Sequence, residues 1–237
     1  MKYHYNNIDD EFVAYNWADK LGLDWSVALD LLLDSEYSDC LVNFIEQIYT
    51  SENEVYPVKN RLFKPFQRCS LKEVKVVIID NRPVKDIRSS GIGRGIFESS
   101  VLIADLPLEL RNFRDCIYET IYGNQHSVTN FDNTLYDYTD NGMLFLNTSM
   151  CVTKDENYTI IWKNFIRNVI KKINKTKENI VYLFLTGDND DLLEYIDEDK
   201  NKIIKNTTSV LMSYSSVFVE TDEYIEETYP PSSLLVW

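Results

Sequence analysis

The sequence predicts an α/β fold of three layers, in which a central four-stranded parallel sheet is covered by helices on both faces. Four short apolar runs are typical of strands buried on both faces, and segments with helical periodicity lie between them. Strands that alternate with helices are joined by right-handed crossovers and form a parallel sheet. The 237 residues contain no internal repeat, low-complexity stretch or linker. We therefore expect one domain over residues 1–237.

The first half of the chain is expected to supply helices and then the first strand. Over residues 26–49 apolar positions recur at helical spacing, which predicts one or two amphipathic helices with Ser26 as a possible N-cap. The β-branched run at 74–79 predicts a buried strand, which an Asn-Arg-Pro sequence at 81–83 ends. A glycine-bearing loop at 89–100 follows.

The second half alternates helices with strands. In order, the pattern predicts a helix at 107–122, a strand at 143–148, a helix at 159–175, a strand at 179–187, a short helix at 190–196 and a strand at 209–216. Gly123 follows the first of these helices, where a C-cap belongs. In a parallel sheet the working loops lie beyond the carboxyl ends of the strands, and here they begin at Asp80, Asn147, Thr186 and Tyr214.

Composition excludes several classes of protein. With 44% hydrophobic residues the chain is not intrinsically disordered, and its apolar runs are too short for a membrane span. The four cysteines lack zinc spacing and there are only two histidines, so no metal site or cofactor is expected. The N-terminus has no signal-peptide pattern, which predicts a cytoplasmic protein. The 21 asparagines and many Lys, Ile and Tyr residues suggest an AT-rich genome, compatible with a phage protein in its host's cytoplasm.

Charge is distributed unevenly along the chain. The 24 basic and 38 acidic residues give a net charge of −14, which repels polyanions. Residues 61–100 alone carry nine basic and four acidic side chains, a local excess of +5. This distribution argues against a general DNA-binding protein but leaves a local basic face for DNA.

Four segments resemble one known family. VKVVIIDNRP at 74–83 resembles VKVVILGQDP, and GMLFLNTSMCV at 142–152 resembles GVLLLNTVLTV. The helix at 160–174 and the strand at 179–187 are similar to the elements that follow in that family. On these motifs the chain resembles the uracil-DNA glycosylases of the main, uracil-specific class. Weaker similarities, at Asp24-Trp25, Tyr56-Pro57, 106–112 and 221–225, extend the resemblance to nearly the whole chain.

The resemblance implies that the catalytic groups have changed. A uracil-DNA glycosylase flips its nucleotide into a pocket, and bond cleavage needs a carboxylate near the sugar and a donor toward the uracil anion. Arg82 holds the position of the family's aspartate, and an arginine neither deprotonates water nor stabilises a sugar cation. Tyr214 is matched to the family's histidine, and Val84 to the tyrosine that excludes the thymine methyl group. Glu220, Asp222 and Glu223 lie where the family is basic.

The resemblance also implies that part of a base pocket is retained. Asn147 matches the asparagine that reads the uracil edge, Phe97 lies at or beside the stacking aromatic, and Asn81 replaces the glutamine of the same loop. Asn147 has an alternative interpretation as a strand-end residue that caps a turn. Either Asp80 or Asp86 could replace the lost carboxylate, although each is two or more residues from the family position.

Three hypotheses follow for the function. The first is a catalytically degenerate member of the family, not an enzyme, that acts as a binding or scaffold protein for a protein partner in DNA replication or repair. An acidic surface that mimics DNA is one specific form of this hypothesis. The alternative is an active uracil-DNA glycosylase with altered catalytic residues. A third keeps base-specific DNA binding, through residues 61–100, without chemistry.

Overall fold

The computed structural model describes residues 15–51, 54–97, 103–123, 131–186, 189–208, 211, 214–235 and 237. Three predicted segments are only partly described. Residues 98–100 of the loop at 89–100, residue 187 of the strand at 179–187, and residues 209, 210, 212 and 213 of the strand at 209–216 lie outside the described residues. No helix in the described ranges is both long and apolar enough to cross a bilayer.

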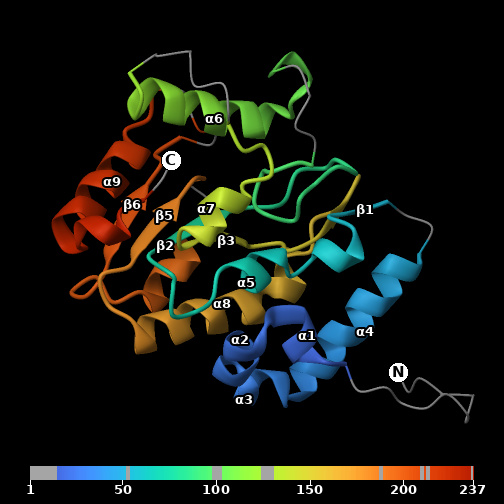
Figure 1. Cartoon of the computed structure of the whole chain (residues 1–237). Coiled ribbons are helices and arrows are strands. Elements are labelled where there is room, and N and C mark those ends of the chain that lie inside the picture. The colour runs from blue at the N-terminus through green and yellow to red at the C-terminus, as the bar shows by residue number, and fades with distance from the viewer. Residues whose placement is uncertain are drawn as a thin grey trace, which may run out of the picture.

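A four-stranded parallel sheet forms the centre of the fold, as predicted. Its strands are β2 (Val76–Asp80), β3 (Met143–Asn147), β5 (Val181–Phe184) and β6 (Lys202–Lys205), in the spatial order β3-β2-β5-β6. All three pairings are parallel, so the carboxyl ends of the strands lie at one edge (Figure 1). A separate antiparallel pair joins β1 (Val55–Tyr56) to β4 (Val152–Thr153).

The fourth strand differs from the prediction, which placed it at 209–216. It is β6, at Lys202–Lys205, and Leu211 and residues 214–216 lie in no strand. β6 is an edge strand with only Ile204 buried, so its KIIK sequence lacks the apolar run that marks a central strand. The loop that follows the last strand therefore begins at Asn206 and not, as predicted, at Tyr214.

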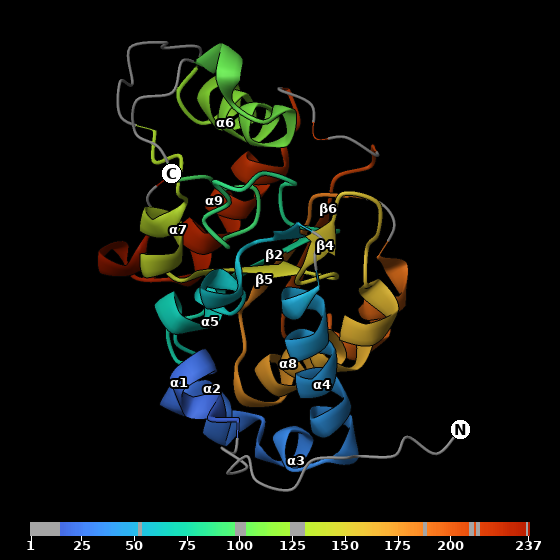
Figure 2. The same cartoon turned by 90° about the vertical axis from the view of Figure 1, so that its right-hand side faces the viewer.

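Successive strand residues face opposite layers of the core. In β2, Val77 and Ile79 pack into one hydrophobic cluster, and Val76 and Ile78 into the other. Figures 1 and 2 show the two helical layers on either side of the sheet. The first layer contains α1 (Trp17–Leu21), α2 (Leu23–Ala28), α3 (Asp30–Leu33), α4 (Glu36–Thr50), α5 (Lys64–Arg68) and α8 (Thr159–Thr176), and the second contains α6 (Leu108–Thr120), α7 (Tyr136–Asp140) and α9 (Val217–Thr228).

Most predicted helices are present, with one correction at the N-terminus. α6 and α8 lie within a residue or two of their predicted bounds, and the segment predicted at 190–196 is a 3₁₀ helix at Asp190–Tyr195. Ser26 is not an N-cap, because it lies inside α2 and its hydroxyl donates to the Leu23 carbonyl at 2.9 Å. The region at 26–49 is divided among α2, α3 and α4.

Candidate functional site

The ends of β2 and β3 bring Asp80, Asn81 and Asn147 together, as expected for neighbouring parallel strands. Asp80 pairs in register with Asn147. Beyond them the two chains stay linked, because the backbone N–H of Thr148 donates to the Asp80 carbonyl at 2.8 Å and that of Ser149 to the Asn81 carbonyl at 3.0 Å. The site is thus held on rigid backbone rather than on a free loop.

Asn147 carries a buried hydrogen-bond acceptor that has no partner among the described residues. The residue is 4% exposed, and its Oδ1 is buried without a hydrogen-bond partner among the described residues. A buried acceptor left without a donor costs about 1–3 kcal/mol and is uncommon in folded proteins. The atom lies at the carboxyl end of β3 but is not exposed, and Asn147 is not among the residues that line the neighbouring pocket at the end of β2.

Asn81 presents the opposite chemistry. Its Oδ1 accepts a hydrogen bond from Asn189 Nδ2 at 2.9 Å, and the same Nδ2 lies 3.3 Å from Thr186 Oγ1. With its oxygen turned to Asn189, the amide group of Asn81 keeps both of its N–H donors for a ligand. Asn189, which sets this orientation, follows β5 and was not predicted from the sequence.

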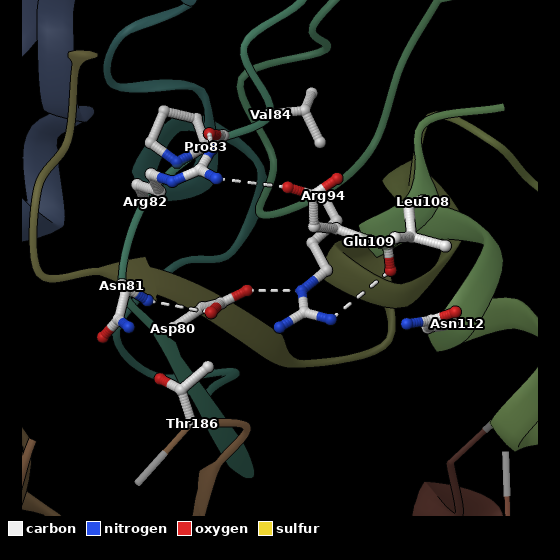
Figure 3. A pocket seen from close by; sticks show the side chains of 10 residues that line it. All are labelled: Asp80, Asn81, Arg82, Pro83, Val84, Arg94, Leu108, Glu109, Asn112 and Thr186. Carbon is white, nitrogen blue, oxygen red and sulfur yellow. Dashed lines mark hydrogen bonds and ion pairs between the residues drawn. The ribbon is translucent and has the colours of Figure 1, made fainter. Parts of the chain in front are cut away.

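A cavity of about 250 Å³ opens beside the end of β2 (Figure 3). Four of its lining residues are charged, two with each sign, so the cavity walls carry no formal net charge. The lining residues are Asp80, Asn81, Arg82, Pro83, Val84, Arg94, Leu108, Glu109, Asn112 and Thr186. We call this space the edge cavity.

A buried ion pair forms one wall of the edge cavity. Arg94 Nε donates to Asp80 Oδ2 at 2.5 Å, and each residue is only 5% exposed. Asp80 Oδ1 also accepts from the Asn81 backbone N–H at 2.8 Å, and Arg94 Nη1 donates to the Glu109 carbonyl at 3.4 Å. Burial alone lowers the pKa of Arg94, but the Asp80 carboxylate raises it above its ordinary value overall. Arg94 is therefore held in its charged form.

The glycine-containing loop at 89–96 packs closely against the sheet and so places Arg94 beside Asp80. Gly93 has φ +44°, and a Cβ there would lie 2.5 Å from Cδ1 of Phe145 on β3. The loop is closed by the Ser90 N–H, which donates to the Gly95 carbonyl at 2.9 Å. Residues 89–96 are buried, so the glycines permit close approach to the sheet rather than an open phosphate-binding loop.

Arg82 lines the other side of the edge cavity. Its Nη2 lies 3.2 Å from Glu109 Oε1, and the two side chains are 32% and 42% exposed. In Figure 3 Glu109 lies between the two arginines, one held by its carboxylate and the other by its backbone carbonyl. Arg82, which the sequence resemblance matches to the family's aspartate, is thus partly neutralised by a carboxylate from α6, a partner that the sequence did not reveal.

Phe97 and Tyr214 are not among the residues that line the edge cavity. The Phe97 ring lies 4.1 Å from the Arg61 guanidinium and edge-on to Tyr136 at 5.5 Å. Tyr214 is 73% exposed and precedes α9. Tyr214 does not follow the last strand directly, because that strand ends at Lys205, and its match to the family's histidine stays a prediction.

The arginines of residues 61–100 are mostly paired within the fold. Four of the five arginines in this segment form ion pairs with carboxylates. The pairs are Arg68–Asp140, Arg82–Glu109, Arg88–Asp86 and Arg94–Asp80. Asp80 and Asp86 are already counted in the +5, so only the pairs with Asp140 and Glu109 reduce the excess of the segment. Among the described residues no group of three His, Cys, Asp or Glu side chains is placed to hold a metal ion.

Comparison with known proteins gives a consistent result. The chain is 30% identical over 190 residues to a uracil-DNA glycosylase of Flavobacterium johnsoniae, which covers 79% of this chain and 82% of the relative. A uracil-DNA glycosylase of Azobacteroides pseudotrichonymphae is 26% identical over 218 residues, or 88% of this chain and 96% of that one. No family model matches the sequence.

Solved structures share the fold. The crystal structure of mimivirus uracil-DNA glycosylase superposes with a TM-score of 0.70 at 15% identity, over 97% of this chain and 94% of that one. A variant of mimivirus UNG, in complex with UGI, gives a TM-score of 0.72 at 14% identity, over 92% of this chain and 94% of that one.

Proposed function

This chain belongs to the uracil-DNA glycosylase family, and from that premise we propose that it binds uracil in DNA at the carboxyl edge of its sheet and hydrolyses the N-glycosidic bond. The observation that carries the proposal is the Oδ1 atom of Asn147, an acceptor that has no donor among the described residues. Uracil offers an N–H donor to that oxygen and a carbonyl acceptor to the amide of Asn81. Cytosine offers the opposite pattern along the same edge, so this pair of amides favours uracil.

Hydrolysis requires that the C1′–N1 bond breaks with its electron pair leaving on uracil, while water adds to C1′ and gives up a proton. A carboxylate near the sugar stabilises the cation and takes that proton. In this chain the candidate is Asp80, the buried carboxylate at the end of β2. Arg94, which contacts Asp80, supplies guanidinium donors in the same cavity for the developing uracil anion.

Two ion pairs favour a second candidate function, a non-catalytic binding or scaffold protein of replication or repair. Arg82 places a fixed positive charge where the family has its aspartate, and such a charge repels a sugar cation. Asp80 already accepts hydrogen bonds from Arg94 and from its own loop. In this function the net charge of −14 favours a protein partner over DNA.

One experiment separates the two functions. Purified protein is incubated with a single-stranded oligonucleotide that contains one uracil, and abasic sites are scored by alkaline cleavage. We expect turnover that falls at least about a hundredfold in Asn147→Ala. Asn164→Ala, an exposed amide on α8, is the matched control and is expected to keep full activity.

Absence of turnover in the wild-type protein would overturn the enzymatic proposal. In that case Arg82→Asp tests whether the chain lost activity by losing one carboxylate. A gain of cleavage in this variant would mean that the rest of the pocket is still able to support the reaction. Binding of a uracil oligonucleotide that Asn147→Ala weakens and Asn164→Ala does not would retain base recognition without chemistry.

A further inference from the structure

A groove between α3 and α8 lies away from the edge cavity. It has a volume of about 180 Å³ and is lined by Ala28, Leu29, Asp30, Leu31 and Leu32 on one wall and by Asn168, Lys171, Lys172 and Lys175 on the other. α8 connects the carboxyl end of β3 to the amino end of β5, so its last turns lie at the opposite edge of the sheet from Asn147. Figure 1 shows α2 and α3 at the base of the molecule, below α8. We call this space the α3–α8 groove.

The α8 wall of the groove carries unpaired positive charge. Lys171, Lys172 and Lys175 form no ion pair with any described carboxylate, whereas Lys163 and Arg167, earlier on the same helix, both bind Asp191. Lys171 Nζ lies 4.5 Å from the Tyr195 ring centroid, a contact that leaves its charge in place. In a chain with a net charge of −14, this cluster of cations is a local exception that attracts carboxylates.

The α3 wall is apolar apart from Asp30 and continues as an exposed stripe of apolar side chains. Leu31 is 88% exposed, and Leu23 and Val27, at intervals of four residues before it, are 72% and 63% exposed. Intervals of four place side chains on one face where the chain is helical, as in α2 and at the start of α3. Single exposed apolar side chains are ordinary, but a row of three that ends in a groove is typical of an interaction surface.

We propose that the α3–α8 groove and its stripe bind an acidic amphipathic peptide segment of a partner protein. Its apolar side chains would lie on Leu23, Val27 and Leu31, and its carboxylates would face the lysines of α8. Recognition of an amphipathic helix by an apolar groove with complementary charge at its rim is a recurrent mode of binding.

Exposed acidic residues favour a peptide over nucleic acid or a lipid surface. Asp24, Asp30 and Asp34 are exposed among the leucines of the stripe. A phosphate backbone or an anionic membrane laid across both walls would meet these carboxylates as well as the lysines, and would be repelled on the apolar side. A peptide with separate acidic and apolar faces satisfies both walls at once.

The test uses the full chain and a labelled peptide of about 16 residues with leucines at helical spacing on one face and glutamates on the neighbouring face. Binding is followed by fluorescence anisotropy at low and high salt. We expect the triple variant Lys171→Glu/Lys172→Glu/Lys175→Glu to weaken binding at least about tenfold, and Leu31→Ser to weaken it about fivefold. The control triple Lys72→Glu/Lys154→Glu/Lys202→Glu makes the same change in net charge at exposed sites elsewhere and is expected to change affinity less than twofold or so.

Several results would overturn the proposal. The first is equal weakening by the two triple variants, because the interaction would then be a general charge effect. A second is equal binding of a peptide with the same composition in scrambled order. A third is tighter lysine-dependent binding of an oligothymidylate or of vesicles with anionic phospholipid, which would assign the groove to a phosphate surface. Self-association of the chain through Leu31, seen by light scattering and lost in Leu31→Ser, would assign it to a second copy.

Discussion

The edge cavity and the α3–α8 groove use positive charge in opposite ways. In the cavity, Arg94 is bound by Asp80 and Arg82 by Glu109, so the cations are neutralised within the fold. In the groove, the lysines of α8 have no carboxylate partner among the described residues. The comparison shows that a local count of charged residues does not locate an anion-binding surface. In the segment with a +5 excess the arginines are mostly paired, whereas Lys72 and Lys85 are exposed and have no carboxylate partner among the described residues.

The largest effect is expected from breaking the buried pair. Arg94→Ala leaves the Asp80 carboxylate buried without its partner, which typically costs about 3–5 kcal/mol. We expect a matching fall in the free energy of unfolding measured by urea denaturation. Arg82→Ala is the control, because its pair with Glu109 is about one-third exposed and is expected to contribute less than about 1 kcal/mol. Equal losses in the two variants would contradict the contrast between buried and exposed pairs.

A smaller effect is expected from the loop that carries Arg94. In Gly93→Ala the new Cβ would lie 2.5 Å from Phe145 Cδ1 on a backbone with φ +44°, which combines overpacking with strain and is expected to cost about 2–4 kcal/mol. Gly123→Ala isolates the strain, since Gly123 has φ +59° and no atom within 4 Å of its Cβ position. Thermal unfolding compares the two variants. A loss in Gly93→Ala no greater than that in Gly123→Ala would show that the loop has room to move away from β3.

The smallest effect concerns pH. The hydrogen bonds from Arg88 hold the pKa of the Asp86 carboxyl below its ordinary value. A carboxylate with a depressed pKa stabilises the fold above its unfolded pKa, near 4, and loses that contribution as pH falls through the lower folded value. Because both side chains are partly exposed, Arg88→Ala is expected to lower stability at pH 7 by less than about 1 kcal/mol and to leave stability near pH 2 unchanged. Urea denaturation at the two pH values checks this sign, and an equal loss at both would contradict it.

The sequence predicted the parts of the fold in which one residue pattern determines one structure. β2, β3 and β5 are continuous apolar runs, and α6 and α8 follow a period of 3.6 residues. β6 was missed because an edge strand needs to bury only one side, and KIIK satisfies that with Ile204. The expectation that Tyr214 directly follows the last strand depended on that strand.

The site was predictable only where strand ends define it. Asn81 and Asn147 meet because parallel neighbours in register end together. Arg94 and Asn189 reach the site by tertiary folding: one arrives on a glycine loop packed against Phe145, and the other bonds to Asn81 across 108 positions in the chain. Neither contact leaves a periodic signal in the sequence, so neither was available before the structure.

The length of α8 has a consequence for simultaneous binding. Thr159 at its start lies near the carboxyl edge, and Lys175 in its last turn lines the α3–α8 groove. At 1.5 Å per residue these positions are about 24 Å apart along a single helix. A ligand at one end therefore does not contact a ligand at the other end. The two proposed ligands, an acidic peptide in the α3–α8 groove and DNA at the strand ends, could then be bound at the same time.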